Sequence, residues 1–302
     1  MKLLVTGALR MSNSNQDCIC RMGHSIDYVQ NECTDLNLTD IVLSEYDGVI
    51  CNSLFQYTPI HSFPSLKYIQ LTSAGTDRVD MDYIKNHGIK LNNARGVYSI
   101  PMAEFAVSSV LYFYKSLDFF RDNQRNCCWR KHRGLLEIFG KTVCILGCGD
   151  VGTECAKRFQ ALGCNVVGLN RTLHENDCFD EIYPLEDLCR VVANSDIVIV
   201  TLALTDETRG IFGDDAFSYM KNGAVLVNIS RGPIINNVSM IEHLSSNRIY
   251  AALDVFDEEP LSKDSPLWYM DNVLITPHNS FVSEGNQERL WNLIRDNLEN
   301  YV

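Results

Sequence analysis

The sequence predicts an α/β protein with parallel sheets. Short apolar segments, typical of buried strands, alternate with helical segments along most of the chain. Residues 143–152 join such a strand to a turn with the pattern G-x-G-x-x-G, and a helical segment follows at 154–162. A chain of 302 residues is long enough for two domains.

The glycine turn predicts a dinucleotide site. Gly147 permits the tight turn, Gly149 lets the backbone approach a pyrophosphate, and Gly152 lets the helix pack closely on the strand. The start of the helix then presents N–H groups and a partial positive charge to the phosphates. Asp150 and Val151, between the second and third glycines, are further expected cofactor contacts. The alternative is a glycine turn without a ligand. The flanking strand and helix favour the nucleotide site.

The first part of the chain predicts a small α/β domain. The expected strands cover residues 2–6, 47–51, 66–71 and 89–92. The third strand ends in a turn of small residues at 72–77, whose N–H groups can form a nest for an anion. A plain loop before a helix at 79–86 explains that turn equally well.

The middle of the chain predicts a buried helix and an arm. Residues 93–98 form a loop, and residues 101–117 form a helix with Pro101 in its first turn. This helix is apolar nearly all round, so we expect it between domains or at a subunit interface. Residues 118–133 are polar, cationic and aromatic, and they lead to the glycine strand as an arm.

Further strands and helices follow the glycine turn. The expected strands cover 165–169, 196–201, 224–229, 251–256 and 273–276, with helices at 185–194, 238–247 and 283–302. Polar residues follow the strands, and the carboxyl edge of such a sheet is where ligands bind. The residues expected to line the cofactor at this edge are Leu202, Thr208 and Ile229.

The residues after strand 165–169 bear on the choice of cofactor. A carboxylate at this point would bond the ribose 2′-OH of NAD and repel a 2′-phosphate. The chain has Asn170, Arg171 and Thr172 instead. The guanidinium group of Arg171 can form hydrogen bonds to a phosphate, and the Thr172 hydroxyl can donate another. The sequence therefore predicts NADP(H) as the preferred cofactor, with NAD(H) possible. The alternative is that Arg171 only points into solvent.

Three ionisable residues follow neighbouring strands and predict hydride transfer to a 2-oxo acid. Arg231 offers a bidentate cation for a carboxylate and carbonyl. His278 can give the forming alkoxide a proton near neutral pH, and Glu259 would orient its imidazole. Each residue alone has an ordinary structural explanation. Together, at the ligand edge of a dinucleotide sheet, they predict the catalytic set.

At these motifs the chain resembles the D-isomer-specific 2-hydroxyacid dehydrogenases. The resemblance covers nearly the whole chain. It rests on residues 73–77, 93–104, 146–152, 228–232, 253–260 and 276–278. It implies that Arg231 binds substrate, that Glu259 supports His278 as general acid/base, and that Asp254 contacts the nicotinamide carboxamide. The turn of Ser73, Ala74 and Gly75 would hold the substrate carboxylate.

The resemblance also implies the domain organisation. Two Rossmann-like or flavodoxin-like domains with parallel sheets would flank an interdomain cleft. Residues 1–98 and 281–302 would form the substrate-binding domain, and residues 99–280 would form the dinucleotide-binding domain. The helix at 101–117 would lie at the interface of a homodimer.

The loop at residues 52–57 bears on the substrate. It carries no Arg or Lys, whereas family members that act on phosphorylated hydroxyacids have cations around this loop. This favours glyoxylate, hydroxypyruvate or a similar small 2-oxo acid, with Leu54, Phe55 and Tyr57 lining the pocket. The alternatives are a phosphoglycerate dehydrogenase-like enzyme and a nucleotide-sensing co-regulator on the same scaffold. Formate dehydrogenase relatives have Gln in place of Glu259, which disfavours that activity.

Composition excludes several other classes. The net charge of −12 disfavours nucleic acid and anionic membranes as partners. No apolar run approaches the roughly 20 residues of a membrane span, and the start predicts a strand rather than a signal peptide. The 12 cysteines include no C-x-x-C pair, so we expect reduced thiols in a cytoplasmic protein and no metal site.

Overall fold

The computed structural model describes residues 1–301, which form two compact units. The first unit contains residues 1–98 and the segment that begins at Ser283, and the second contains Ser99–Val282. The chain thus leaves the first unit at 98/99 and returns to it at 282/283, where the sequence analysis expected 98/99 and 280/281.

A parallel five-stranded sheet forms the centre of the first unit, with the order β2-β1-β3-β4-β5. Its strands are β1 (Lys2–Thr6), β2 (Ser25–Val29), β3 (Gly48–Cys51), β4 (Tyr68–Leu71) and β5 (Lys90–Asn92). Its helices are α1 (Asn13–Arg21), α2 (Met81–Asn86) and α9 (Asn286–Glu299). Because strand side chains alternate, Leu3 and Val5 pack with α1 and α9, whereas Leu4 faces the opposite core beside α2.

A parallel seven-stranded sheet forms the centre of the second unit, with the order β12-β11-β10-β9-β6-β7-β8. Its strands are β6 (Thr142–Leu146), β7 (Asn165–Asn170), β8 (Glu181–Pro184), β9 (Ile197–Val200), β10 (Val225–Asn228), β11 (Tyr250–Leu253) and β12 (Val273–Ile275). Its helices are α3 (Ser99–Tyr114), α4 (Leu117–Arg125), α5 (Asp150–Ala161), α6 (Leu188–Ala193), α7 (Asp214–Tyr219) and α8 (Asn237–Ser245).

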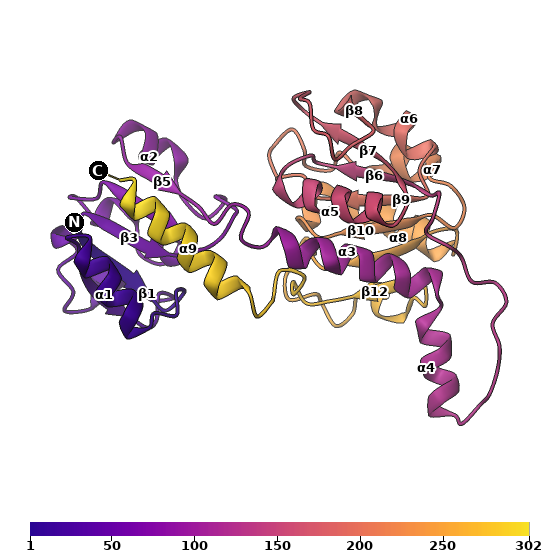
Figure 1. Ribbon diagram of the computed structural model, residues 1–302, viewed down its shortest axis with the longest axis horizontal. Helices are drawn as coiled ribbons and strands as arrows, with labels where there is room; N and C mark the ends of the chain where they lie inside the picture. Colours follow the sequence, from indigo (N-terminus) through magenta and orange to yellow (C-terminus); the bar gives the residue numbers. More distant parts are fainter. Residues whose placement is uncertain (302) are drawn as a thin grey trace. The chain divides into compact units, whose positions relative to one another are not determined.

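Helices cover both faces of this sheet (Figure 1). Helices α3 and α5 lie side by side on one face, and α6, α7 and α8 cover the other. Along β6, Val143 and Ile145 face the first layer, whereas Cys144 and Leu146 face the second. Such burial on both faces explains why these strands are continuous apolar runs in the sequence.

Several predicted bounds are wrong. The helix expected at 101–117 ends at Tyr114, because Ser116 has a left-handed backbone (φ +46°) and α4 begins in a new direction. The last helix, expected at 283–302, covers Asn286–Glu299, and residue 302 lies outside the described residues. Five α-helices and strands were not predicted because they are short, polar or half-exposed: α1, β2, α4, β8 and α7. Of these, α4 lies in the segment expected to be an arm.

Candidate active site

The turn after β6 needs glycine at two positions for steric reasons. Gly147 has φ +111°, and a Cβ atom there would lie 2.7 Å from the backbone nitrogen of Leu202. A Cβ atom on Gly152 would lie 2.0 Å from the carbonyl oxygen of Gly147. A Cβ atom on Gly149, in contrast, would have no atom within 4 Å. The first and third glycines thus permit close packing, and the second faces open space.

The start of α5 suits an anion. Gly149 is the N-cap residue of this helix and makes no side-chain capping hydrogen bond, and the N–H groups at a helix start favour an anion. Strand β6 pairs with β7 on one side and with β9 on the other, which makes its carboxyl end the point where the strand order reverses. Ligands of doubly wound sheets bind in the crevice at such a point.

The segment after β7 approaches the glycine turn. The Asn170 side chain accepts a hydrogen bond from the Cys148 backbone at 3.4 Å and donates one to the Thr172 carbonyl at 2.8 Å. Arg171 does not simply point into solvent. Its Nη1 atom lies 3.1 Å from Oε2 of Glu207, in the loop after β9.

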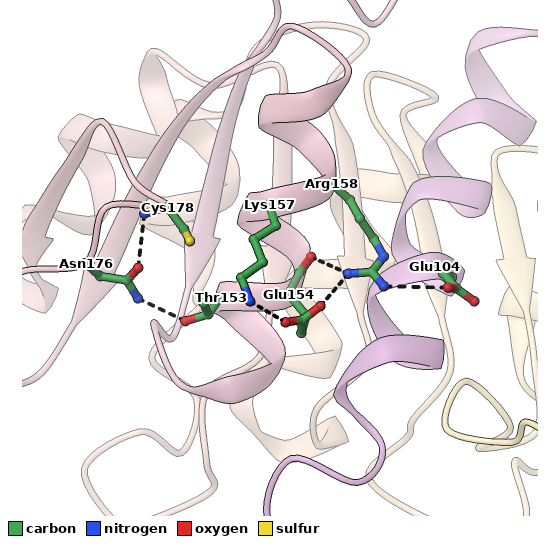
Figure 2. Close-up of polar contacts among 7 residues, drawn as sticks. All are labelled: Glu104, Thr153, Glu154, Lys157, Arg158, Asn176 and Cys178. Atoms are coloured by element: carbon green, nitrogen blue, oxygen red, sulfur yellow. Dashed lines mark hydrogen bonds and ion pairs between the residues drawn. The ribbon is translucent and has the colours of Figure 1, made fainter. Parts of the chain in front are cut away.

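Figure 2 shows the polar contacts that connect α5 to α3 and to the loop after β7. Nη1 of Arg158 lies 2.6 Å from Oε2 of Glu154, and Nη2 lies 3.5 Å from Oε1 of Glu104 on α3. At the first turn of α5, Asn176 donates a hydrogen bond to the Thr153 hydroxyl at 2.9 Å. The loop that begins at Arg171 is therefore anchored to the helix that follows the glycine turn.

Hydrogen bonds of the Thr208 side chain stabilise the loop after β9. This buried hydroxyl donates to the Ala203 carbonyl at 2.8 Å and accepts from the Thr205 nitrogen at 2.8 Å. The Ser230 hydroxyl donates to the carbonyl of Leu202. Ile229 and Leu202 are buried beside these contacts. The sequence analysis expected cofactor contacts from Leu202, Thr208 and Ile229; those contacts stay predictions.

The segments after β10 and β11 meet at Gly232. A Cβ atom there would lie 2.0 Å from the carbonyl carbon of Phe256, so only glycine fits. Beside it, Arg231 donates from Nη1 to the Ser230 carbonyl at 2.8 Å. The Phe256 nitrogen donates to Oε1 of Glu259 at 3.1 Å, which orients that carboxylate. The two predicted catalytic segments thus lie in backbone contact.

His278 and Glu259 form a pair. Nδ1 of His278 lies 2.8 Å from Oε2 of Glu259, and the two side chains are 33% and 37% exposed. Because a carboxylate accepts hydrogen bonds, Nδ1 carries the proton of this contact, and Nε2 is the atom that can exchange a proton with a ligand. His278 has φ +50°, a left-handed backbone that turns its side chain at the strand end.

Asp254 positions the His278 segment, a role that the sequence analysis missed. This fully buried carboxylate accepts from the Thr276 hydroxyl at 2.6 Å and from the Asn279 and Ser280 nitrogens at 2.7 and 2.9 Å. The backbone carbonyl of Asp254 accepts a hydrogen bond from the His278 nitrogen at 2.8 Å. The sequence did contain a signal for this role. Asp254 follows one strand, and the hydroxyl and amide side chains of Thr276 and Asn279 follow the next.

The turn of Ser73, Ala74 and Gly75 lies in the first unit. The Ser73 hydroxyl donates to the Gly75 carbonyl at 3.0 Å, and Asn93 donates to the Ala74 carbonyl at 2.6 Å. These bonds fix the carbonyl groups of the turn. The catalytic candidates Arg231, Glu259 and His278 belong to the second unit.

Two charged residues at the loop of residues 52–57 were also missed. Buried Glu32 accepts from the Asn52 and Ser53 nitrogens at 3.0 and 2.7 Å. Nη1 of Arg78 donates to the side-chain oxygen Oδ1 of Asn52 and to the Ser53 hydroxyl at 2.9 and 3.0 Å. The loop has no cation of its own, but Arg78 supplies one from the turn after β4. The sequence could not show this, because 25 or 26 residues separate the partners.

The cysteines are free thiols in the structure. Cys148, inside the glycine turn, is buried, and burial raises the pKa of its thiol to about 12. It therefore stays protonated and poorly nucleophilic at neutral pH. Within residues 1–301, no group of three or more His, Cys, Asp or Glu side chains could hold a metal ion. No helix in that range is long and apolar enough to cross a membrane.

Comparisons with known proteins agree with this geometry. Residues 107–280 match the family model described as D-isomer specific 2-hydroxyacid dehydrogenase, NAD binding domain. The chain is 32% identical over 267 residues to a glyoxylate reductase of Aeropyrum pernix, a match that covers 83% of this chain and 76% of that one. It is 31% identical over 260 residues to a D-3-phosphoglycerate dehydrogenase of Archaeoglobus fulgidus, covering 85% of this chain.

The match spans only 49% of that phosphoglycerate dehydrogenase, so this chain matches about half of that relative. Among solved structures, a D-isomer specific 2-hydroxyacid dehydrogenase from Xanthobacter autotrophicus Py2, in complex with NADPH and MES, is 26% identical. Its TM-score is 0.77, and the match covers 99% of this chain and 94% of that chain. The α/β fold of the two units is thus shared over 99% of this chain.

Proposed function

Because this chain belongs to the D-isomer specific 2-hydroxyacid dehydrogenase family, we propose that it is an NAD(P)-dependent oxidoreductase that reduces a small 2-oxo acid to the D-2-hydroxy acid. Glyoxylate and hydroxypyruvate are the first candidate substrates. The pair of His278 and Glu259, at 2.8 Å, is the observation that carries this proposal. A nucleotide-binding protein without turnover would not need a histidine held by a carboxylate at the ligand edge of the sheet.

The chain's own residues suit a nicotinamide dinucleotide. Open space at Gly149 and the start of α5 without a capping side chain fit a pyrophosphate. Residues Gly147 to Gly152 would hold it, and Asn170, Arg171 and Thr172 would contact the adenosine ribose. Asp254 would contact the carboxamide. When bound, the nicotinamide supplies the hydride.

The protein would supply binding and a proton. Arg231 would bind the carboxylate and the carbonyl oxygen of the substrate through its guanidinium group. His278 would give the proton on Nε2 to the developing alkoxide, and Glu259 would hold the Nδ1 proton and stabilise the imidazolium before reaction. The backbone of Ser73, Ala74 and Gly75 would bind the substrate carboxylate, as the family resemblance implies.

NADPH is the proposed physiological cofactor. No carboxylate follows β7, and Arg171, the first residue after that strand, would bind the 2′-phosphate. The solved relative with NADPH supports this choice. Cellular NADPH usually drives reduction, so we propose the 2-oxo acid as the substrate.

We also propose a homodimer. Figure 1 shows α4 extending away from the sheet of the second unit. Residues 117–139, which contain α4 and the segment after it, expose several large apolar side chains, and α4 has no buried residue. Trp129 is 99% exposed and Phe139 is 75% exposed. Exposed apolar surface of this kind is typical of subunit interfaces, and a second copy of the chain would cover it.

The decisive test is the oxidation of NADPH and NADH by the purified protein with a panel of 2-oxo acids. We expect turnover with glyoxylate or hydroxypyruvate, and faster turnover with NADPH than with NADH. Bound nucleotide without turnover on any 2-oxo acid would favour the nucleotide-sensing co-regulator instead.

Arg78 favours one second candidate, a phosphoglycerate dehydrogenase-like activity. Its guanidinium group lies against the loop of residues 52–57, so a cation is available there for a phosphorylated tail. The similarity to a phosphoglycerate dehydrogenase also supports it.

A substitution at Arg78 separates the two candidates. We expect hydroxypyruvate to be reduced faster than 3-phosphohydroxypyruvate by the wild type. Arg78→Gln should raise the KM for the phosphorylated compound about tenfold, because a charge-assisted hydrogen bond is lost, and should leave hydroxypyruvate within about twofold. Lys85→Gln, which removes an exposed charge from α2 of the same unit, is the matched control. Preference of the wild type for the phosphorylated substrate would establish the second candidate.

A further inference from the structure

Arg171 and Glu207 form an ion pair above the strand that precedes the glycine turn. Arg171 directly follows β7, and Glu207 lies in the loop after β9. Strands β7 and β9 are the two neighbours of β6 in the sheet. The contact of 3.1 Å therefore crosses from one side of β6 to the other, at the carboxyl edge where the dinucleotide is proposed to bind.

Hydrogen bonds fix the backbone segments that carry Arg171 and Glu207. The loop of Glu207 is fixed by the bonds of the Thr208 hydroxyl to Ala203 and Thr205. The segment of Arg171 is fixed by the bond from Asn170 to the Thr172 carbonyl. The Arg171 and Glu207 side chains themselves are 68% and 71% exposed, so an anion from solvent can reach the guanidinium group.

We propose that Glu207 determines how strongly the protein selects a 2′-phosphate. This inference rests on the proposed role of Arg171 in binding NADPH. In the protein without nucleotide, the Glu207 carboxylate occupies donors of the Arg171 guanidinium group. A 2′-phosphate must displace that carboxylate or share the guanidinium with it, at the cost of repulsion between two anions. A ribose 2′-OH carries no charge and meets no such repulsion, so Glu207 weakens NADPH binding more than NADH binding.

The test is calorimetric binding of adenosine 2′,5′-bisphosphate and 5′-AMP, two probes that differ by the 2′-phosphate. We expect Glu207→Gln to tighten binding of the bisphosphate about 3- to 5-fold, the range for an exposed ion pair, and to leave 5′-AMP within about twofold. Raising the salt concentration should reduce the gain, because the charges are exposed. Arg171→Ala should weaken the bisphosphate and remove the effect of Glu207→Gln.

Asp206→Asn is the matched control. Asp206 is the exposed neighbour of Glu207, so this variant removes the same charge from the same loop and leaves the ion pair intact. Equal effects of Asp206→Asn and Glu207→Gln, or no gain from Glu207→Gln, would overturn the inference while the role of Arg171 stands. If the wild type bound both probes equally and Arg171→Ala changed neither, the preference for NADPH would fall together with this inference. The proposed reductase activity is tested separately, by turnover.

Discussion

Replacing His278 by alanine is expected to lower turnover by about 100-fold or more, the range for loss of a general acid, with nucleotide affinity unchanged. The physical reason is the geometry of the pair. Glu259 holds Nδ1 at 2.8 Å, so the imidazole is oriented and Nε2 is the atom that would give a proton to the substrate in the proposed mechanism. The glycine turn that is proposed to hold the nucleotide is a separate segment of the chain. The measurements are kcat with the best 2-oxo acid and the dissociation constant of NADPH.

The backbone of His278 requires a second variant. Its φ of +50° lies in the left-handed region, where Asn is better tolerated than Ala. His278→Asn should therefore keep the thermal stability of the wild type and still lose turnover. Glu259→Gln preserves an oxygen for the Phe256 nitrogen but removes the charge that orients the imidazole, and we expect a loss of about 10- to 100-fold. Unchanged turnover in both His278 variants would exclude His278 from the mechanism.

Alanine at the second and third glycines of the turn is expected to have opposite effects. Gly152→Ala should destabilise the fold by about 1–3 kcal/mol, the usual cost of overpacking, because its Cβ would lie 2.0 Å from the Gly147 carbonyl oxygen. Gly149→Ala should leave stability unchanged, because φ is −80° and no atom lies within 4 Å of the added Cβ. It should nevertheless weaken nucleotide binding by at least about tenfold, because this glycine allows a pyrophosphate to approach the backbone.

The measurements are the thermal midpoint of each variant without nucleotide and the dissociation constants of NADPH and NADH. Each variant serves as the control for the other, since both add one methyl group to the same turn. Normal nucleotide affinity in Gly149→Ala would place the pyrophosphate elsewhere. A thermal midpoint of Gly152→Ala equal to that of the wild type would contradict the contact with Gly147.

The sequence predicted the elements whose residues carry a local signal. The strands that form the middle of the second sheet are continuous apolar runs, since both faces of that sheet are covered by helices. The short helix α7 and the edge strands β2 and β8 lack such runs and were missed. The end of the helix at Tyr114 was missed because it depends on the backbone conformation of Ser116.

The sequence by itself determined the fold class, the glycine turn and the candidates Arg231, Glu259 and His278, since each follows a recognisable strand or motif. Only the tertiary structure decided the contacts between these segments. It gave the geometry of the His278–Glu259 contact, which the sequence analysis expected. It also showed that Asp254 fixes the His278 segment, that Arg78 contacts the loop of residues 52–57, and that Arg171 pairs with Glu207. The physical reason is that these partners lie 19 to 36 residues apart in the chain and meet because parallel strands end at one edge of a sheet.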